Sequence, residues 1–304
     1  MNSVFVGAGV AIITPFDKDG QIDFERFSKL IEFQIANKTD AIIVCGTTGE
    51  GSTLSVKERL QLFSHTVRQV HGRVPVIAGT GSNSTFFTLD LAKEAEKTGI
   101  DAHLIVTPYY NKTSQAGLIR HYNFLADRLT KPIIVYNVPS RTGMTIKPET
   151  YKELALHNNI VGVKEADPDI SKLIKSLALC KDNLDFYIGN DDLITVSAFL
   201  GCKGVISVLS NILPRFTHNM TKTALDGKLC EANKMQSDVI ELIDALFSDV
   251  NPIPIKTALK MLSYDIGYLR GPLCDMSPEN AQKLESVMQK YESLLLNENR
   301  NSLQ

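Results

Sequence analysis

Apolar residues along the chain follow two alternating patterns. Short apolar runs, typical of buried strands, are separated by longer segments in which apolar residues recur at helical intervals. In the first long segment, 23–37, Phe24, Phe27 and Leu30 fall on one helix face. The predicted strands are 6–13, 41–45, 74–78, 102–106, 133–136, 160–164, 186–188 and 204–207. The predicted helices that follow them are 23–37, 56–70, 85–98, 114–129, 148–157, 170–180, 192–200 and 214–225.

This regular alternation predicts the fold class. Eight strand–helix pairs within about 225 residues are typical of an α/β protein with a closed parallel barrel, the (β/α)8 or TIM barrel. The alternation stops near Gly227. The segments beyond it are helical only: 230–247, 254–262 and 278–297. We therefore expect a catalytic barrel at 1–227 and a small C-terminal helical domain at 228–304.

The composition excludes several kinds of partner. Of the 304 residues, 43% are hydrophobic and 22% are charged, which is an ordinary globular balance with material for a large core. The formal net charge of -2 supplies no positive field for nucleic acid or an anionic membrane. The longest apolar runs are too short to span a bilayer, and no signal peptide is evident at Met1. We expect a cytoplasmic protein with no nucleic-acid or membrane partner.

The cysteines and histidines argue against a metal site. Five cysteines, an odd number, are widely spaced, and no Cys-x-x-Cys pair occurs. The six histidines are scattered, without the spacing of a zinc-binding helix. Free thiols in a reducing compartment are the simplest interpretation. The cysteines are Cys45, Cys180, Cys202, Cys230 and Cys274.

The most informative stretch is 159–165, a strand-like run that leads into a lysine. Because side chains alternate along a strand, Gly162 and Lys164 point to one side, and Val161 and Val163 to the other. Lysine is rarely buried without a reason, and burial disfavours the charged form of an amine. A neutral amine can attack a carbonyl carbon and form a Schiff base. The alternative is a lysine that caps the strand end and reaches water.

Residues just after the strands carry the remaining chemistry, because barrel enzymes work at the carboxyl ends of their strands. Thr47 and Thr48 lie in a glycine-flanked loop, and their hydroxyl and backbone N–H groups suit a small carboxylate. Threonines in turns also often bond only their own backbone. Ser52 stands where a phosphate-binding loop has lysine, and Gly79–Gly81 lacks the third glycine of a dinucleotide motif.

Tyrosines and an arginine complete the candidate site. Tyr136 ends the strand before Lys164, so the two should lie side by side, and a phenol can move a proton to and from a carbinolamine. Tyr109 and Tyr110 follow the fourth strand, and Arg141 could clamp a second carboxylate. The alternatives are an amphipathic strand-end tyrosine, interface aromatics and a surface ion pair. Together these residues supply a nucleophile, a proton relay and two carboxylate sites.

Four stretches carry a resemblance to a known family. They are Gly46-Thr-Thr-Gly-Glu50, Tyr136-Asn-Val-Pro-Ser-Arg-Thr-Gly143, Val163-Lys-Glu165 and Asn251-Pro-Ile-Pro-Ile-Lys256. In order and spacing they resemble the motifs of the pyruvate-dependent class I lyases and aldolases, most closely those of the dihydrodipicolinate synthases. The resemblance covers essentially the whole chain, including the helical appendage.

The resemblance implies a Schiff-base mechanism. Lys164 would form the Schiff base with pyruvate. Thr48, with the backbone near Thr47, would hold the pyruvate carboxylate. Thr47, Tyr136 and Tyr110 would form the proton relay, with Tyr110 contributed by the neighbouring subunit of a tight dimer.

The resemblance also implies the second substrate and the assembly. Arg141 would receive the carboxylate of L-aspartate 4-semialdehyde, and the backbone of Gly189 and Ile206 would line the pyruvate pocket. No metal or organic cofactor would be needed, because the protonated imine is the electron sink. The reaction would be the first committed step of diaminopimelate and lysine biosynthesis. Members of the family are commonly homotetramers, built as dimers of tight dimers.

One departure from the family concerns feedback inhibition by lysine. The chain keeps Asn83 and Tyr109. However, Val56, Arg59 and Phe87 stand where lysine-inhibited relatives carry two histidines and a glutamate. An apolar side chain cannot pair the ammonium of the effector, and an added arginine would repel it. We therefore predict weak or absent inhibition by lysine.

Two other functions remain open from the sequence. N-acetylneuraminate lyases and 2-keto-3-deoxy sugar acid aldolases share the lysine and the tyrosine, but they need hydroxyl-binding pockets for a polyol. The paired threonines and Arg141 favour a short carboxylated aldehyde instead. A non-catalytic barrel that binds a ligand or a partner is the second alternative, against which the complete relay argues.

Overall fold

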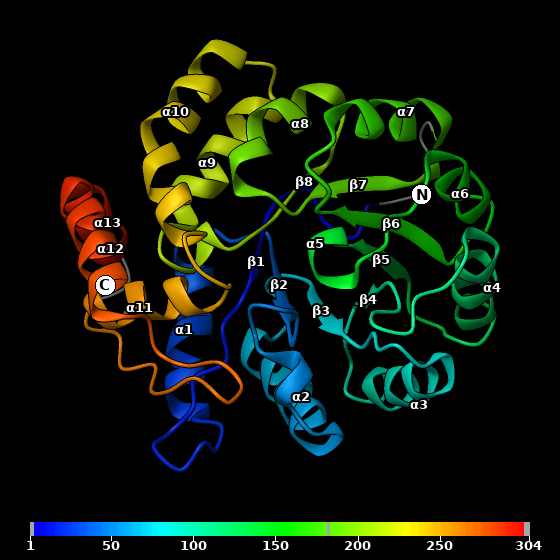
Figure 1. Cartoon of the computed structure of the whole chain (residues 1–304), viewed down its shortest axis with the longest axis horizontal. Coiled ribbons are helices and arrows are strands. Elements are labelled where there is room, and N and C mark those ends of the chain that lie inside the picture. Colours follow the sequence, from blue (N-terminus) through cyan, green and yellow to red (C-terminus); the bar gives the residue numbers. More distant parts are fainter. Residues whose placement is uncertain (1–2, 181–182, 301–304) are drawn as a thin grey trace.

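The computed structural model describes residues 3–180 and 183–300, which form the predicted (β/α)8 barrel (Figure 1). Eight parallel strands of this described part pair in chain order, and β8 closes the barrel on β1. The strands are β1 (Gly7–Ala11), β2 (Ala41–Val44), β3 (Val76–Gly79), β4 (Ala102–Val106), β5 (Ile133–Asn137), β6 (Ile160–Glu165), β7 (Asp185–Ile188) and β8 (Gly204–Ser207). The predicted fold class is confirmed.

Helices cover the outside of the barrel and continue beyond the last strand. Asp23, Ser55, Ser84 and Ser114 each cap a helix by accepting a hydrogen bond from the backbone N–H three residues on. The helices are α1 (Phe24–Ala36), α2 (Val56–Val70), α3 (Thr85–Glu96), α4 (Gln115–Ala126), α5 (Pro139–Thr142), α6 (Pro148–Leu154), α7 (Ile170–Cys180), α8 (Ile194–Leu200), α9 (Pro214–Leu225), α10 (Leu229–Leu246), α11 (Ile253–Met261), α12 (Pro278–Lys290) and α13 (Glu292–Arg300).

Three helical segments differ from the sequence-based expectation. The short helix α5, which starts at Pro139, was not predicted, because four residues are too few to show a helical period. The predicted helix 278–297 is two helices, since α12 ends at Lys290 and α13 begins at Glu292. The predicted helix 192–200 begins with a 3₁₀ turn at Asp191–Leu193. The α5 difference matters for function, because α5 carries Arg141 at the barrel mouth.

Side chains fill the barrel interior, as the alternation along each strand requires. Leu104, Ile134 and Tyr136 are buried there in one cluster with the aromatic pair Phe5 and Tyr187. The rings of Phe5 and Tyr187 stack with centroids 4.3 Å apart, and the Tyr187 hydroxyl donates to the Phe5 carbonyl at 2.8 Å. This N-terminal segment packs into the end of the barrel opposite to the predicted site.

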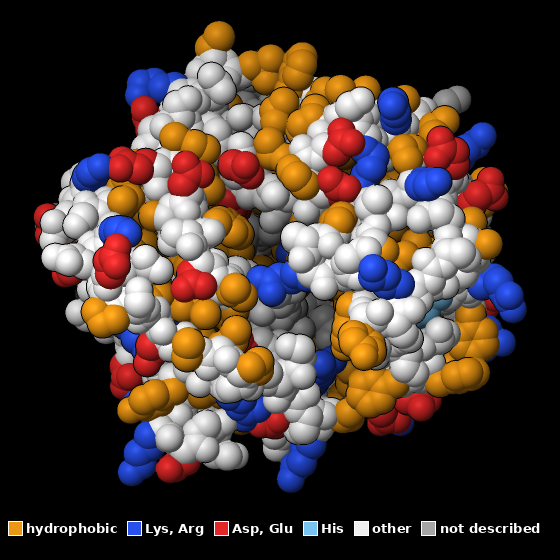
Figure 2. All heavy atoms as spheres, viewed as in Figure 1, with side chains coloured by type: hydrophobic (Ala, Val, Ile, Leu, Met, Phe, Trp, Pro, Cys, Tyr) orange, Lys and Arg blue, Asp and Glu red, His pale blue; other side chains and the backbone are white. Residues whose placement is uncertain are grey.

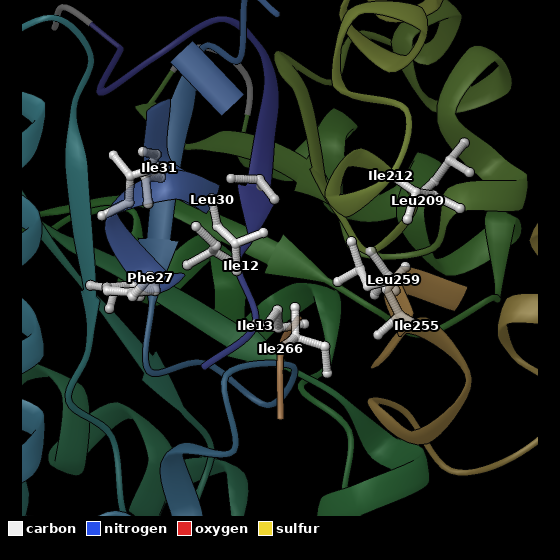
Figure 3. Close-up of a cluster of buried hydrophobic side chains, with 14 of the residues drawn as sticks. Ile12, Ile13, Phe27, Leu30, Ile31, Leu209, Ile212, Ile255, Leu259 and Ile266 are labelled. Carbon is white, nitrogen blue, oxygen red and sulfur yellow. The ribbon is translucent and has the colours of Figure 1, made fainter. Parts of the chain in front are cut away.

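The C-terminal helices pack against one flank of the barrel. Figure 1 shows α10 to α13 gathered beside α1 and α9. One apolar cluster joins α1, the ends of β1 and β8, and α11 (Figure 3). Its labelled members are Ile12, Ile13, Phe27, Leu30, Ile31, Leu209, Ile212, Ile255, Leu259 and Ile266. Removal of this shared apolar surface from water fixes α11 close to the barrel mouth.

The predicted division of the chain at 227/228 stays a prediction. The outer ends of the two predicted domains, 1–2 and 301–304, lie outside the described residues. No helix of the described chain is both long and apolar enough to cross a membrane.

Candidate active site

Lys164 lies at the carboxyl end of β6, inside the barrel mouth. It is the register partner of Tyr136 on β5, and its Nζ lies 4.4 Å from the centroid of the Tyr136 ring. Both residues are buried, with 5% and 6% of their surfaces exposed. Among the described residues, the Lys164 amine has neither a hydrogen bond nor an ion-pair partner. The structure therefore places the predicted nucleophile directly beside the predicted proton relay.

The threonine loop is folded tightly against the end of β2. A Cβ on Gly51 would lie 2.2 Å from the Cys45 carbonyl oxygen, and one on Gly79 would lie 2.3 Å from the same atom. Because no side chain fits at either distance, the loop needs glycine at both positions. This fold turns Thr47 and Thr48 towards the cavity that contains Lys164.

Thr48 and Arg141 are connected through a residue of the C-terminal region. The Asn251 Nδ2 donates to the Thr48 Oγ1 at 2.9 Å. An Arg141 guanidinium nitrogen donates to the Asn251 carbonyl oxygen at 2.8 Å. Arg141 is exposed and forms no ion pair with any residue that the structure describes. Its remaining N–H groups are therefore free to bind a carboxylate.

Gly189 follows β7 and makes room for the Lys164 side chain. A Cβ on Gly189 would lie 3.1 Å from the Lys164 Cε and 2.9 Å from the Ala166 Cβ. The Gly189 N–H donates to the Glu165 carbonyl oxygen at 2.7 Å, which ties the ends of β6 and β7 together. A larger residue here would displace the lysine.

These groups surround one cavity of about 360 Å³ at the carboxyl ends of the strands. Figure 2 shows a hollow in the centre of this face, bordered by basic side chains. The predicted site residues in the cavity wall are Thr47, Thr48, Tyr136, Arg141, Lys164 and Gly189. The space suits a substrate of a few carbon atoms, since ligand pockets commonly start at about 300 Å³.

A second cavity of about 270 Å³ adjoins the first and shares Thr47, Tyr136 and Arg141 with it. Arg59 and Tyr109 line this second space. Arg59 is buried without an ion-pair partner among the described residues, and burial lowers the pKa of its guanidinium. Of the other positions considered for lysine feedback, Val56 and Phe87 are exposed.

Two predicted site residues lie apart from this constellation. Tyr110 is 92% exposed and does not reach the cavity of its own chain. Its φ of 68° is a left-handed value that is unfavourable for a bulky residue. Ile206 is buried in the barrel interior on β8 and is not part of the cavity wall. The predicted roles of both residues stay predictions.

Sequence reasoning missed the contribution of the C-terminal region to the cavity wall. Phe247, Asp249, Val250 and Asn251 lie between α10 and α11 and line the same cavity as Lys164. The only signal in the sequence was the motif that begins at Asn251, which carried part of the family resemblance. Periodicity alone cannot reveal a contact between residues that are about 90 positions apart.

A buried ion pair holds this C-terminal segment to the threonine loop. Lys256 on α11 contacts the Glu50 carboxylate, and its ammonium also donates to the Tyr268 carbonyl at 2.9 Å. The second Glu50 oxygen accepts the Arg270 backbone N–H at 3.0 Å. Burial lowers the pKa of Lys256 to about 8, although Glu50 opposes this change. The pair therefore connects the two parts of the chain that form the cavity.

The cysteines are unpaired and far from any metal-like arrangement. All five have free thiols, and burial raises the pKa of Cys45 and of Cys202 to about 12. Over residues 3–180 and 183–300, no three His, Cys, Asp or Glu side chains are grouped so that they could hold a metal ion. The expectation that the reaction needs no metal stays a prediction.

The fold and the groups at its mouth are those of a (β/α)8-barrel lyase that works on small carbonyl compounds. Comparison with known proteins then gives the particular family. Residues 4–291 match the model of the Dihydrodipicolinate synthetase family. The chain belongs to this family. The predicted family and the predicted class of enzyme are thereby confirmed.

Individual relatives agree with this assignment. The chain is 48% identical to the 4-hydroxy-tetrahydrodipicolinate synthase 1 of Clostridium acetobutylicum, over 95% of this chain and 98% of that protein. A crystal structure of the Aquifex aeolicus dihydrodipicolinate synthase is 41% identical, with a TM-score of 0.92 over 95% of this chain and 98% of that one. A structure of the Cyanidioschyzon merolae enzyme with lysine bound is 35% identical, with a TM-score of 0.91 over 95% of this chain and 98% of that one.

Proposed function

We propose that this chain is a 4-hydroxy-tetrahydrodipicolinate synthase that condenses pyruvate with L-aspartate 4-semialdehyde. The observation that carries the proposal is the amine of Lys164, which lies in the cavity beside Tyr136 and has no hydrogen bond or ion pair in the part of the chain that the structure describes. The high identity to curated synthases over nearly the whole chain supports the same conclusion. The product would enter the synthesis of diaminopimelate and lysine.

The first half of the reaction would form a Schiff base on Lys164. The Lys164 amine attacks the ketone carbon of pyruvate, and the resulting carbinolamine loses its hydroxyl as water. Tyr136 passes the proton that this loss requires and later removes one from the methyl carbon to give the enamine. The Thr48 hydroxyl and the N–H groups near Thr47 would hold the pyruvate carboxylate.

The second half would use the carboxylate site at Arg141. The enamine carbon attacks the aldehyde of L-aspartate 4-semialdehyde, whose carboxylate binds the free N–H groups of Arg141. The amine of this substrate then attacks the imine carbon, closes the ring and displaces the Lys164 amine. One water molecule is released per turnover, and the enzyme returns to its starting state. Each step uses acid–base and imine chemistry, so the proposal includes no metal or organic cofactor.

The proton relay would be completed by a second copy of the chain. Tyr110 is largely exposed in the single chain, which suits a side chain that inserts into a neighbouring subunit. Thr47, Tyr136 and Tyr110 of the partner subunit would then connect the active site with solvent. We expect a homotetramer, a dimer of tight dimers, in the cytoplasm. Sedimentation velocity of wild type and Tyr110→Phe would test assembly separately from proton transfer.

The decisive experiment is a comparison of substrates. Pyruvate is supplied with either L-aspartate 4-semialdehyde or N-acetylmannosamine, and Lys164→Ala serves as the control. Turnover with the semialdehyde alone, lost in the variant, is the expected result. Preference for the sugar would retain the Schiff base but contradict the role of Arg141. Reaction with neither compound would favour a barrel that binds ligands without catalysis.

A further inference from the structure

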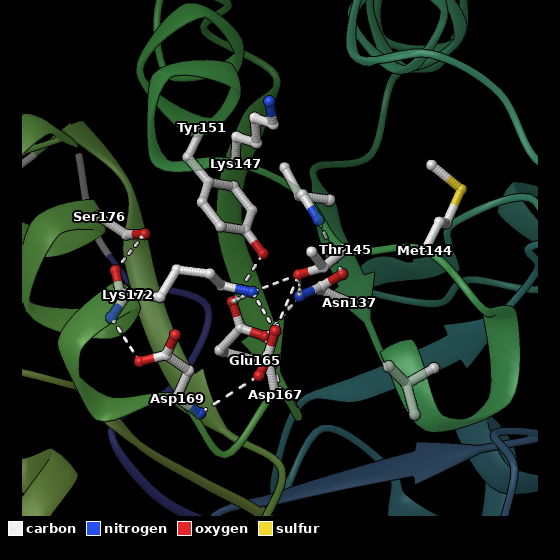
Figure 4. Close-up of polar contacts among 12 residues, drawn as sticks. Asn137, Met144, Thr145, Lys147, Tyr151, Glu165, Asp167, Asp169, Lys172 and Ser176 are labelled. Atoms are coloured by element: carbon white, nitrogen blue, oxygen red, sulfur yellow. Dashed lines mark hydrogen bonds and ion pairs between the residues drawn. The ribbon is translucent and has the colours of Figure 1, made fainter.

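The residues that follow Tyr136 and Lys164 form a pair of their own. Asn137 and Glu165 are the next register partners on β5 and β6. Because side chains alternate along a strand, they point to the outside of the barrel while Tyr136 and Lys164 point to the inside. The Asn137 Nδ2 donates to the Glu165 Oε1 at 2.6 Å (Figure 4). The two strands are thus joined by side chains immediately behind the reactive groups.

The Glu165 carboxylate is held on every side. Its Oε1 also accepts the Asp167 backbone N–H at 3.0 Å, and its Oε2 accepts the Tyr151 hydroxyl at 2.8 Å. The Lys172 ammonium lies 3.8 Å from Oε2. Burial raises the pKa of Glu165, and these partners oppose that rise. A buried carboxylate with this many partners has one fixed position, since any movement would leave polar groups unpaired.

Asn137 extends the same network to the segment after α5. Its Oδ1 accepts the Ile146 backbone N–H at 3.2 Å, and its Nδ2 lies 3.3 Å from the Thr145 Oγ1. Thr145 in turn donates to the Asp167 carboxylate at 2.9 Å. Lys172 contacts both Thr145 and Asp167 (Figure 4). Thr145 and Ile146 follow α5, the helix that carries Arg141. The same network therefore contacts the ends of β5 and β6, which carry Tyr136 and Lys164, and the segment next to Arg141.

The backbone ladder between β5 and β6 is irregular at its beginning and regular at its carboxyl end. Its register shifts between Ile133 and Ile134, near the beginning of β5. Such an irregularity increases the local twist of a strand. From Ile134 to Asn137 the register is continuous, and the Ala166 backbone N–H donates to the Asn137 carbonyl oxygen at 2.9 Å. The Asn137–Glu165 side-chain bond adds a second connection at the same strand ends, directly behind Tyr136 and Lys164.

We propose that Asn137 and Glu165 are a positioning pair that sets the distance and orientation between the Lys164 amine and the Tyr136 phenol. The inference rests on the proposed Schiff-base function. Both residues are fully buried outside the barrel and lie outside the two cavity walls, so neither touches substrate. They act through the strand ends, and their effect is on the rate of proton transfer within the bound complex rather than on binding.

The test uses Asn137→Ala, Glu165→Gln, the double variant and a control. One sample of each enzyme is treated with pyruvate and borohydride, and the fraction of Lys164 that is trapped gives the fraction of competent sites. Turnover is measured on a second, untreated sample and is divided by that fraction. We expect Asn137→Ala to lower kcat about 30-fold, since a misplacement of about 1 Å costs up to 100-fold, and to change the KM for pyruvate little. Glu165→Gln keeps an acceptor for Asn137 and should retain most of kcat.

The control is Tyr122→Phe, which removes an equally buried hydrogen bond, from the Tyr122 hydroxyl to the Ile105 carbonyl at 3.0 Å. It should lower the melting temperature without lowering kcat per competent site. The double variant should be about as slow as Asn137→Ala, because without Asn137 there is no side-chain bond for residue 165 to accept. A kcat per site in Asn137→Ala close to wild type, or an equal loss in Tyr122→Phe, would overturn the inference. Absence of trapping in wild type would instead contradict the proposed function.

Discussion

Two lysines are buried at the same barrel mouth, and their surroundings are opposite. Lys164 and Lys256 each place the ammonium group over an aromatic ring, at 4.4 Å from Tyr136 and 4.5 Å from Phe16. Lys256 also has the Glu50 carboxylate and a backbone carbonyl as partners. Lys164 has no hydrogen bond or ion pair to any residue that the structure describes, and it faces a cavity.

This difference separates a structural lysine from a reactive one. A buried ammonium normally requires a charged partner, because transfer from water is unfavourable. Lys256 meets that requirement, so its pairing alone explains its burial. Lys164 interacts electrostatically with the buried Asp191 carboxylate, but no hydrogen bond or ion pair within the described chain joins it to a partner. A role in covalent chemistry explains why this lysine is buried without such a bond.

The largest expected effect comes from removal of the reactive lysine. Lys164→Ala should lower kcat at least about 1,000-fold, because no other group can form the Schiff base. Its melting temperature should stay near that of wild type, since no partner is left unpaired. Steady-state assays and thermal unfolding measure the two quantities. Substantial turnover in this variant would show that Lys164 is not the nucleophile.

The converse effect is expected for the structural lysine. Lys256→Met leaves the buried Glu50 carboxylate without its counter-ion, which should cost about 3–5 kcal/mol of unfolding free energy. Lys164→Met is the matched variant and should cost much less. Urea unfolding of both proteins measures the difference. Equal losses of unfolding free energy in the two variants would show that the ion pair with Glu50 does not account for the effect of Lys256→Met.

The comparison extends to the arginines of the mouth. Arg270 is bound by Glu58 and by the carbonyls of Gly20 and Thr53. Within residues 3–180 and 183–300, the Arg141 side chain has one partner, the neutral Asn251 carbonyl. Arg141→Lys should therefore raise the KM for L-aspartate 4-semialdehyde about tenfold, because a lysine cannot bind a carboxylate bidentately. The KM for pyruvate should change little. A larger increase in the KM for pyruvate would show that Arg141 binds the carboxylate of pyruvate rather than that of L-aspartate 4-semialdehyde.

The structural lysine, Lys256, should also make the stability depend on pH. The pKa of Lys256 is lowered to about 8 in the folded chain, below its usual value of 10.5. Between these two pH values the unfolded chain binds more protons at this residue, so stability rises with pH. Wild type should gain on the order of 1 kcal/mol relative to Lys256→Met between pH 8 and pH 10. Urea unfolding at both pH values measures this difference in unfolding free energy. A decrease in stability of the same size would contradict the lowered pKa of Lys256.

The smallest expected effect concerns Arg59, a buried charge that faces the second cavity without an ion-pair partner in the described part of the chain. A second cation is repelled there, so millimolar lysine should inhibit less than about twofold. An activity titration with lysine measures this directly. Strong inhibition would contradict the interpretation of Val56, Arg59 and Phe87.

The barrel was predictable because its signal is local and repeated. Each strand run and each amphipathic helix can be recognised within a short window, and eight repeats leave one closed topology. The neighbourhood of Tyr136 and Lys164 was predictable for the same reason, since consecutive parallel strands of a barrel pair. The helix α5 was missed because it is shorter than the period that would reveal it.

The C-terminal wall of the cavity could not be predicted from periodicity. Asn251 reaches Thr48 only because α11 packs into the apolar cluster on the barrel flank and Lys256 pairs with Glu50. Such contacts depend on the tertiary fold. The Asn137–Glu165 pair was equally hidden, because the two residues read as ordinary polar strand ends until their register is known.

The most direct test of the central claim is to reduce the enzyme with borohydride in the presence of pyruvate and to map the modified lysine by peptide mass spectrometry. Our account predicts one reduced pyruvate on the peptide that contains Lys164 and none on Lys256. Modification of Lys256, or of several lysines without preference, would contradict the claim that the unpartnered buried lysine is the nucleophile.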